Sequence, residues 1–253
     1  MTNDHLIQIG KVAGTRYARI LTYPRTDSDQ EKLRVAELRR MGVSAIGFNG
    51  HTLIDGVPVL GKGCVGIVTQ AIVGGELAAL KIRRLDADRP SMQKEARLLR
   101  LANAVGVGPR LMGSTQNFLV MKLFPGVPLF RWAEGVNASG PPVRGVLGGL
   151  LSDCFKLDAV GLDHGELSHA PRNVLVDAAG KSCIVDFESA SMVRRVANVT
   201  SLLQYFLFGS ISKNLRSSAV FGKKKPIVKA LSEYKRESSV GNFQSVLRIL
   251  RLL

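Results

Sequence analysis

The first half of the chain has the hydrophobic pattern of β-strands separated by glycine turns. Apolar and β-branched residues predict strands over 52–60, 66–72 and 77–83. Gly74-Gly75 separates the second strand from the third and is typical of a tight turn. The three strands are therefore expected to form an antiparallel meander that begins after His51.

Residues 1–50 precede this meander and carry no motif that predicts a function. A β-rich piece is expected over 17–23, followed by a helix from about Ser28. Ser28 and Glu31 have capping-box spacing, and Gly42 is typical of a helix end. We interpret this region as an N-terminal extension that either packs on the sheet or binds a partner.

One helix and one further strand complete the first half of the chain, and the second half, beyond residue 124, is mainly helical in pattern. A helix is expected from Pro90-Ser91 to about Ala104, and a strand over 118–123 comes before Pro125-Gly126. Two later groups have the i, i+3, i+4, i+7 spacing of amphipathic helices. They are Val143, Val146, Leu147, Leu150, Leu151, Cys154 and Phe155, and then Phe243, Val246, Leu247 and Leu250. The nearly all-apolar segment 199–208 predicts a buried helix between them.

Composition and net charge limit the kinds of molecule that the protein is expected to bind and the compartment in which it is expected to act. The 253 residues are 45% hydrophobic, enough for one large core or two small ones. A formal net charge of +15 predicts attraction to nucleotide phosphates, RNA, acidic proteins or anionic lipid. Cys64, Cys154 and Cys183 lack zinc-site spacing, so we expect reduced thiols in a cytoplasmic protein. Neither a signal peptide nor an apolar run of the roughly 18 residues of a membrane span is recognisable.

The string Gly61-Lys-Gly-Cys-Val-Gly66 has the G-x-G-x-x-G spacing of a phosphate-binding loop. Such glycines let backbone N–H groups approach phosphate oxygens closely. In dinucleotide-binding units the loop opens a helix, but here Ile67, Val68 and Thr69 favour a strand. A glycine loop between two strands is the kinase arrangement, which predicts a lysine on the following strand.

Lys81 meets this prediction in the strand sequence Leu77-Ala-Ala-Leu-Lys81-Ile. A lysine that holds the α- and β-phosphates needs a carboxylate to fix its ammonium group. Glu95 lies on the next expected helix and is the candidate, although an isolated glutamate there would more simply belong to a solvated face. Because Glu95 follows both the glycine loop and Lys81, the sequence favours an ion pair.

Two groups in the second half have the chemistry of a metal site. Val185-Asp186-Phe187-Glu188 resembles the D-F-G element, whose aspartate coordinates Mg²⁺. Asn173 lies thirteen residues earlier, at the expected start of a strand, and could bind a second Mg²⁺. A turn residue is the simpler interpretation of an isolated asparagine.

The segment His164-Gly165-Glu166-Leu167 resembles a kinase catalytic loop. Glu166 stands where the catalytic aspartate is usual, and Asn173 follows it by seven residues rather than the usual five. The extra residues fall within 168–172. A longer carboxylate on a longer loop either reaches a substrate hydroxyl and acts as the base or falls short of it, and the sequence leaves both outcomes open. We expect His164 to brace the loop.

Residues 57–208 together resemble a small atypical protein kinase related to the RIO and KEOPS-complex kinases. Three strings look especially like those of a group of predicted archaeal serine/threonine kinases. These are Leu60-Gly-Lys-Gly-Cys-Val-Gly66, Asp163-His-Gly-Glu-Leu-Ser168 and Val185-Asp-Phe-Glu-Ser189. The resemblance implies transfer of the ATP γ-phosphate to a protein serine or threonine, with Mg²⁺.

The resemblance also implies an α+β, two-lobed, protein-kinase-like fold. The N-lobe, 51–124, would be a small antiparallel β-sheet with one main helix, on which the extension 1–50 packs. The C-lobe, 125–253, would be reduced and mainly helical, with a basic C-terminal helix. ATP would lie between the lobes, with its adenine on the hinge backbone around 121–123.

The site residues follow from these matches. The resemblance implies catalytic roles for Lys81, Glu166 and Asp186, and metal binding by Asn173 and Asp186. The residues implied in nucleotide binding are Gly61, Lys62, Gly63, Cys64, Val65, Gly66, Val68, Ala79, Lys81, Glu95, Met121, Lys122 and Leu123. Gly165 stands where regulated kinases have an arginine that binds the phosphate of the activation loop. No A-P-E sequence follows Asp186. An abbreviated activation segment without phosphorylation control is therefore expected.

Three alternatives stay open. An ATPase that assists RNA or ribonucleoprotein assembly would use the basic residues Lys223–Lys225, Arg248 and Arg251. A small-molecule kinase of the aminoglycoside type would need an acceptor pocket, for which about 45 residues remain after Phe208. A pseudokinase would explain Glu166, but the retained lysine and metal-binding candidates argue against it.

Overall fold

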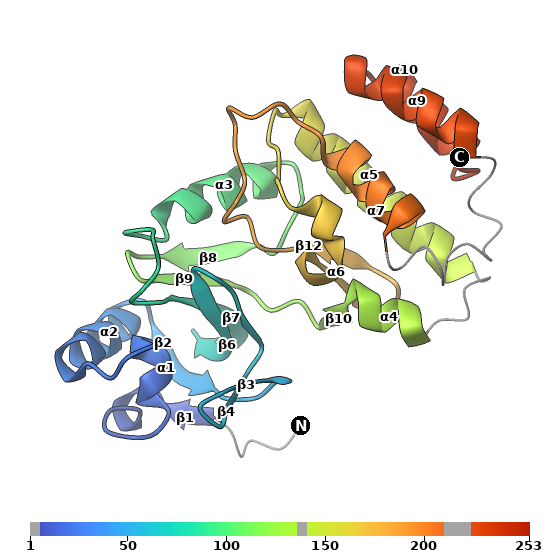
Figure 1. Ribbon diagram of the computed structural model, residues 1–253. Helices are drawn as coiled ribbons and strands as arrows, with labels where there is room; N and C mark the ends of the chain where they lie inside the picture. The colour runs from blue at the N-terminus through green and yellow to red at the C-terminus, as the bar shows by residue number, and fades with distance from the viewer. Residues whose placement is uncertain (1–5, 136–140, 210–223) are drawn as a thin grey trace. The chain divides into compact units, whose positions relative to one another are not determined.

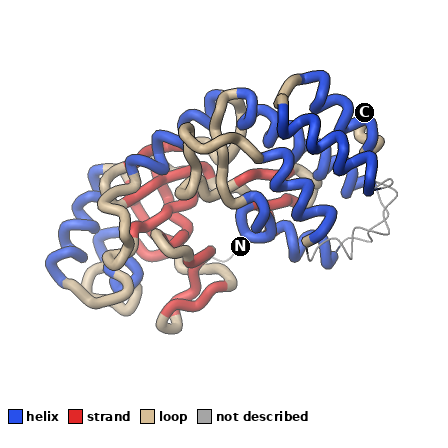
Figure 2. The backbone as a smooth tube through the Cα atoms, turned by 45° about the horizontal axis from the view of Figure 1, so that its top comes forward, coloured by secondary structure: helices blue, strands red, loops and turns tan. Residues whose placement is uncertain are grey.

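The computed structural model describes residues 6–135, 141–209 and 224–253. Its fold class is α+β: strands, red in Figure 2, dominate the first half of the chain and helices dominate the second. The chain divides into two compact units. Unit 1 comprises Met1–Arg100 and Arg110–Leu123, and unit 2 comprises Leu101–Pro109 and Phe124–Leu253.

Unit 1 is built on a seven-stranded antiparallel sheet in the order β1-β2-β6-β7-β9-β8, with β5 paired to β6 (Figure 1). The strands are β1 (Leu6–Gln8), β2 (Val43–Gly47), β5 (Gly61–Lys62), β6 (Gly66–Val73), β7 (Glu76–Arg83), β8 (Leu111–Ser114) and β9 (Phe118–Lys122). The strands predicted over 66–72, 77–83 and 118–123 are confirmed. Strand β8 was not anticipated, because its four residues include a glycine at a register shift and show no alternation.

The single strand predicted over 52–60 is wrong. It is a hairpin of β3 (Thr52–Ile54) and β4 (Val57–Val59). Asp55 and Gly56 form its turn with φ of 49° and 76°. Positive φ at both central residues is typical of the tight turn that Asp-Gly sequences favour.

The N-terminal extension is part of unit 1. The β-rich piece predicted over 17–23 is instead helix α1 (Ala18–Thr22), which buries the consecutive residues Ile20, Leu21 and Thr22 rather than alternate ones. Helix α2 (Ser28–Arg40) is confirmed, but its N-cap is Asp27, whose carboxylate accepts a hydrogen bond from the Gln30 N–H at 2.9 Å. Gly42 follows the helix with φ of 77°, as its predicted role at the helix end requires.

One face of the sheet is covered by the extension. Ile20, Leu21 and Leu38 from α1 and α2 share a hydrophobic core with Leu80 of β7 and Phe118 of β9. Since side chains alternate between the faces of a strand, the residues adjacent to Leu80 point to the opposite face. The extension therefore does not cover that second face, on which Lys81 of β7 meets Glu95 of helix α3 (Gln93–Ala104).

Buried Arg34 ties α2 to the ends of two strands. Its guanidinium donates to the Arg83 carbonyl at 2.6 Å and to Asn117 Oδ1 at 3.0 Å, and it also contacts the Leu21 carbonyl. Glu37, one helical turn later, accepts from both the backbone and the side chain of Asn117. Burial lowers the pKa of Arg34 to about 10, with the Arg83 charge adding to the effect.

Unit 2 is mainly helical with a three-stranded antiparallel sheet. Its elements are β10 (Gly126–Pro128), α4 (Leu129–Gly135), α5 (Pro141–Ala159), η2 (Leu167–His169), α6 (Ala170–Asn173), β11 (Val174–Asp177), β12 (Ser182–Ile184), α7 (Asn198–Phe208), α9 (Lys224–Arg236) and α10 (Val240–Ile249). The three helices predicted there, α5, α7 and α10, are confirmed. Helix α9 was not predicted, and of the basic run 223–225, Lys223 lies outside the described residues.

Asp158 joins three helices of unit 2. At the end of α5, its buried carboxylate accepts from the Asn198 backbone at 3.0 Å and side chain at 2.7 Å, at the start of α7. It also accepts from the Val199 N–H at 3.3 Å and from the Tyr234 hydroxyl of α9 at 2.9 Å. Burial raises the pKa of Asp158 despite these donors.

Two expectations from composition can be checked in the described residues. Cys64, Cys154 and Cys183 are all free thiols, as predicted. Among the described residues, no helix has the length and apolar content needed to cross a membrane.

Candidate functional site

The glycine loop is the turn of a β-hairpin, as predicted. Strands β5 and β6 pair from Gly61 opposite Val68, and the Gly63 N–H donates to the Gly66 carbonyl at 2.8 Å across the turn. A β-carbon placed on Gly61 would meet no described heavy atom within 4 Å. Backbone with open space beside it is what a phosphate group needs for close approach.

Gly66 has a different role from the other two glycines of the loop. A β-carbon there would lie 3.0 Å from Lys81 Cγ and 3.0 Å from the Ile82 carbonyl oxygen. The missing side chain therefore makes room for the aliphatic stem of Lys81, which lies on the neighbouring strand. The third glycine of the motif therefore provides the space for the lysine side chain that the motif predicts on the next strand.

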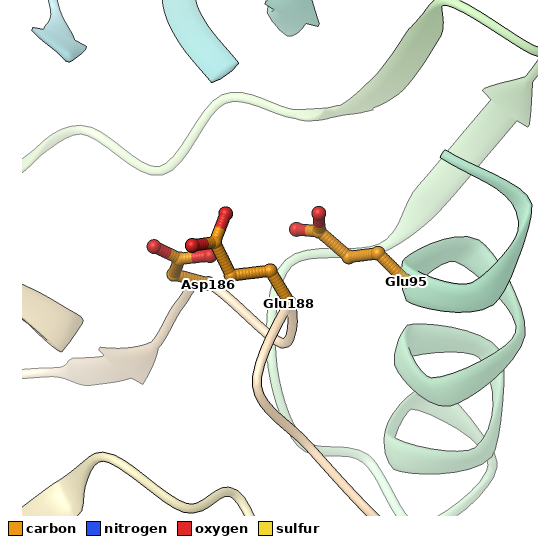
Figure 3. Close-up of side chains that lie close together, drawn as sticks. All are labelled: Glu95, Asp186 and Glu188. Carbon is orange, nitrogen blue, oxygen red and sulfur yellow. The ribbon is translucent and has the colours of Figure 1, made fainter. Parts of the chain in front are cut away.

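The predicted ion pair between Lys81 and Glu95 is confirmed. Lys81 Nζ on β7 lies 2.9 Å from Glu95 Oε1 and 3.0 Å from Oε2 on α3, and each side chain is 5% exposed. Figure 3 shows Glu95 projecting from this helix. A buried ion pair adds little net stability, because desolvation offsets the attraction, so its presence favours a functional role.

The sheet places further nucleotide-site candidates beside Lys81. Val68 lies opposite Lys81 across β6 and β7, and Ala79 lies opposite Met121 across β7 and β9. Since paired residues and residues two apart share a face, all four point away from the core that the extension covers. At the expected hinge, the Lys122 N–H donates to the Arg110 carbonyl at 2.8 Å, and Leu123 follows the end of β9.

Tyr23 and Arg84 contact the glycine loop, and sequence reasoning missed both. The Lys62 ammonium contacts the Tyr23 hydroxyl and lies 4.4 Å from the centre of its ring. Arg84 stacks on the same ring at 5.2 Å and donates to the Gly63 carbonyl at 2.9 Å. Exposed Cys64 follows Gly63 in the same loop. No local pattern around Tyr23 signals this contact, because it depends on how the extension folds.

Asp186 in unit 2 has a backbone conformation that side chains rarely adopt. It follows strand β12 with φ of 68°. Left-handed backbone costs about 1–3 kcal/mol outside glycine, and such residues cluster at functional sites. Glu188, in the position of the D-F-G glycine, brings a carboxylate oxygen within 4.8 Å of one from Asp186 (Figure 3). Sequence reasoning did not include Glu188, although its place in the motif could have suggested it.

The lengthened catalytic loop brings Glu166 and Asn173 together. Asn173 Nδ2 donates to Glu166 Oε2 at 3.1 Å, and the Ser189 hydroxyl donates to the other carboxylate oxygen, Oε1. The two extra residues of the loop are taken up by the compact turns η2 and α6. The side-chain placement of His169 lies outside the described residues.

His164 braces this loop, as predicted. It is fully buried, its Nε2 donates to the Val185 carbonyl at 3.0 Å, and its ring packs edge-on against Phe187 at 5.0 Å. Its backbone N–H donates to Asn198 Oδ1 at 2.8 Å. Burial lowers the pKa of His164, which favours the neutral ring and a structural role.

The segment between Asp186 and α7 is held by Arg194. Its guanidinium contacts the Asp163 carboxylate and donates to the Ser189 carbonyl at 2.9 Å. Gly165 has φ of 89°, and a β-carbon there would lie 2.1 Å from Arg194 Nη2. The glycine that replaces the expected arginine of the loop therefore makes room for an arginine from this segment.

The sequence was also compared with known proteins. No protein-family model matches the chain. A search of curated proteins returns no significant match.

Proposed function

We propose that this protein is an ATP-dependent serine/threonine protein kinase of an atypical, RIO-like type. Unit 1 would correspond to the N-lobe of a two-lobed kinase fold, with the extension as a covering layer on its sheet. Unit 2 would correspond to a reduced C-lobe. The observation that carries the proposal is the buried Lys81–Glu95 pair, next to a glycine hairpin whose third glycine makes room for Lys81.

Each unit supplies groups suited to one part of phosphoryl transfer. In unit 1 the loop backbone and Lys81 would hold the phosphates of ATP, with Glu95 fixing the lysine. In unit 2 Glu166 would accept the proton of the acceptor hydroxyl, because a carboxylate held by Asn173 presents its second oxygen in a fixed direction.

The residues around Asp186 fit a magnesium ion. Its preferred ligands are carboxylate and amide oxygens, and Asp186, Glu188 and Asn173 offer these within unit 2. Bound Mg²⁺ would neutralise charge on the phosphate oxygens. Asn173 can hold Glu166 through its Nδ2 while its Oδ1 serves as a ligand, because the two atoms are distinct.

The test is transfer of label from γ-labelled ATP, with Mg²⁺, to serine or threonine of an added protein acceptor. Asp186→Ala should lower the rate by at least about 100-fold, as expected for loss of a preorganised charge at the reacting centre. Asp153→Asn is the matched control, since Asp153 is a carboxylate of unit 2 that pairs with Lys156 on the surface. Undiminished transfer by Asp186→Ala, with both variants folded, would refute the assignment.

A second candidate is an ATPase that acts on RNA, which the basic C-terminal helices favour. Exposed Lys225, Lys229 and Lys235 follow one side of α9, and Arg248 and Arg251 are exposed at the end of the chain. Such a surface would bind RNA with an affinity that falls steeply as salt is added. ATP hydrolysis that RNA stimulates, without transfer to protein, would select this function over the kinase.

A further inference from the structure

Ser189 places a hydroxyl on the proposed catalytic base. Its Oγ donates to Glu166 Oε1, the carboxylate oxygen that Asn173 does not use. In a transfer reaction, the acceptor hydroxyl must make this same contact with the base. Within unit 2, a hydroxyl of the chain itself therefore occupies the position that an acceptor would take relative to Glu166.

The backbone of Ser189 is fixed by its neighbours. Arg194 Nη2 donates to the Ser189 carbonyl at 2.9 Å, and the Ala190 N–H donates to the Phe187 carbonyl at 3.1 Å across the turn. The turn begins directly after Asp186, the proposed metal ligand. The hydroxyl is thus aligned on Glu166 by main-chain contacts as well as by its own hydrogen bond.

The three side chains form a nucleophile, a base and an orienting group. A hydroxyl bonded to a base that a third residue holds in place is the general signature of an activated nucleophile. Here the hydroxyl is that of Ser189, the base is Glu166, and the orienting group is Asn173, which is buried. We infer that Ser189 is a site of automodification, at which the protein phosphorylates itself.

This inference rests on the proposed kinase function. Ser189 Oγ forms a bond to the γ-phosphorus of ATP, and the bond from that phosphorus to the bridging oxygen of ADP breaks. ADP leaves with the electron pair, and the hydroxyl proton passes to Glu166 Oε1. The product is a phosphoserine, with no other reactant required.

The product should limit its own formation. A phosphoserine carries about −1.5 to −2 charge and no longer offers a hydroxyl proton to Glu166. Repulsion between this phosphate and the Glu166 carboxylate disfavours the charged form of Glu166, which is the form that can accept a proton. Ser189 has a single hydroxyl, so it takes up at most one phosphate, and further transfer that uses Glu166 as the base should then be slower.

The experiment incubates the full chain with Mg²⁺ and ATP and maps phosphate by peptide mass spectrometry. Wild type should carry phosphate at Ser189, and Ser189→Thr should carry phosphothreonine there, because the hydroxyl is retained. Ser189→Ala should lose this modification. Ser191→Ala is the matched control, since the Ser191 hydroxyl accepts from the Val193 and Arg194 N–H groups, and it should still be modified at Ser189.

Two further measurements separate the outcomes. The rate constant for Ser189 modification should not change with protein concentration, because the base and acceptor belong to one chain. A rate constant that rises with concentration would contradict the inference.

In the second measurement, dephosphorylated casein serves as an external acceptor. Labelled casein with an unmodified Ser189 would overturn the inference and leave the proposed kinase intact. Absence of transfer to either acceptor would overturn both.

Discussion

Replacing Lys81 by methionine would leave the Glu95 carboxylate buried without its closest cation. At 2.9 Å and an effective dielectric constant of about 20, the two charges attract by about 6 kcal/mol before desolvation is counted. Removing one member of a buried pair typically costs 3–5 kcal/mol, because the remaining charge stays desolvated. We therefore expect Lys81→Met to lower the free energy of unfolding by about 3–5 kcal/mol.

The double variant Lys81→Met/Glu95→Leu should be more stable than either single variant. An apolar pair of similar volume avoids the desolvation cost, and such replacements are often neutral or stabilising. The measurement is urea unfolding of wild type, both single variants and the double variant. The coupling energy of this cycle should amount to several kcal/mol.

Nucleotide binding should respond differently from stability. All three variants should bind ATP at least about 10-fold more weakly, since none keeps a fixed ammonium for the phosphates. A fluorescent ATP analogue measures this on the folded protein. Additive losses of stability in the double variant would refute the buried coupling. A double variant that binds ATP like wild type would refute the role of Lys81.

Three other predictions concern stability and thiol chemistry. Tyr234→Phe removes a hydrogen bond to the Asp158 carboxylate and should cost about 1.5–3 kcal/mol in urea unfolding, whereas an unchanged midpoint would contradict the contact. Burial and Asp158 raise the pKa of Tyr234 above its ordinary value of 10. The protonated hydroxyl therefore contributes fully to stability below pH 10, and this contribution is lost as the pH rises further. Thermal unfolding between pH 8 and 11 should show the loss of stability, and Tyr234→Phe should make that loss smaller. A thiol reagent should modify exposed Cys64 in the native protein but not buried Cys154 or Cys183. Burial raises the pKa of both buried thiols, to about 12 for Cys183, which keeps them protonated and unreactive. Peptide mapping after labelling shows which of the three cysteines has reacted.

Patterns with a regular period were predicted well from the sequence. The strands β6 and β7 follow from β-branched residues around Gly74-Gly75, and their register then places Lys81 opposite Val68. The pairing of Lys81 with Glu95 followed from the order of the motifs, because a lysine on a buried strand needs a nearby carboxylate. In these cases the local sequence and the packing agree.

Contacts between distant segments could not be predicted. Arg34 reaches Arg83 and Asn117, which lie 49 and 83 residues further along the chain, and no local pattern identifies those partners. The loop between Glu166 and Asn173 shows the same limit. Because the loop has two extra residues, the sequence did not predict whether the Glu166 and Asn173 side chains would be in contact. Their contact depends on the compact turns that residues 167–173 form.

The contrast between Asp158 and Glu166 separates a structural carboxylate from the proposed catalytic one. Asp158 is buried and accepts hydrogen bonds from backbone and side-chain groups of two other helices, so losing its charge would loosen those helices. Glu166 is half-buried, and its two donors are the Asn173 amide and the Ser189 hydroxyl. An amide keeps its protons at ordinary pH, whereas a hydroxyl can give up its proton as its oxygen attacks phosphorus. One donor therefore holds the carboxylate in place while the other can react, and this is what a general base requires.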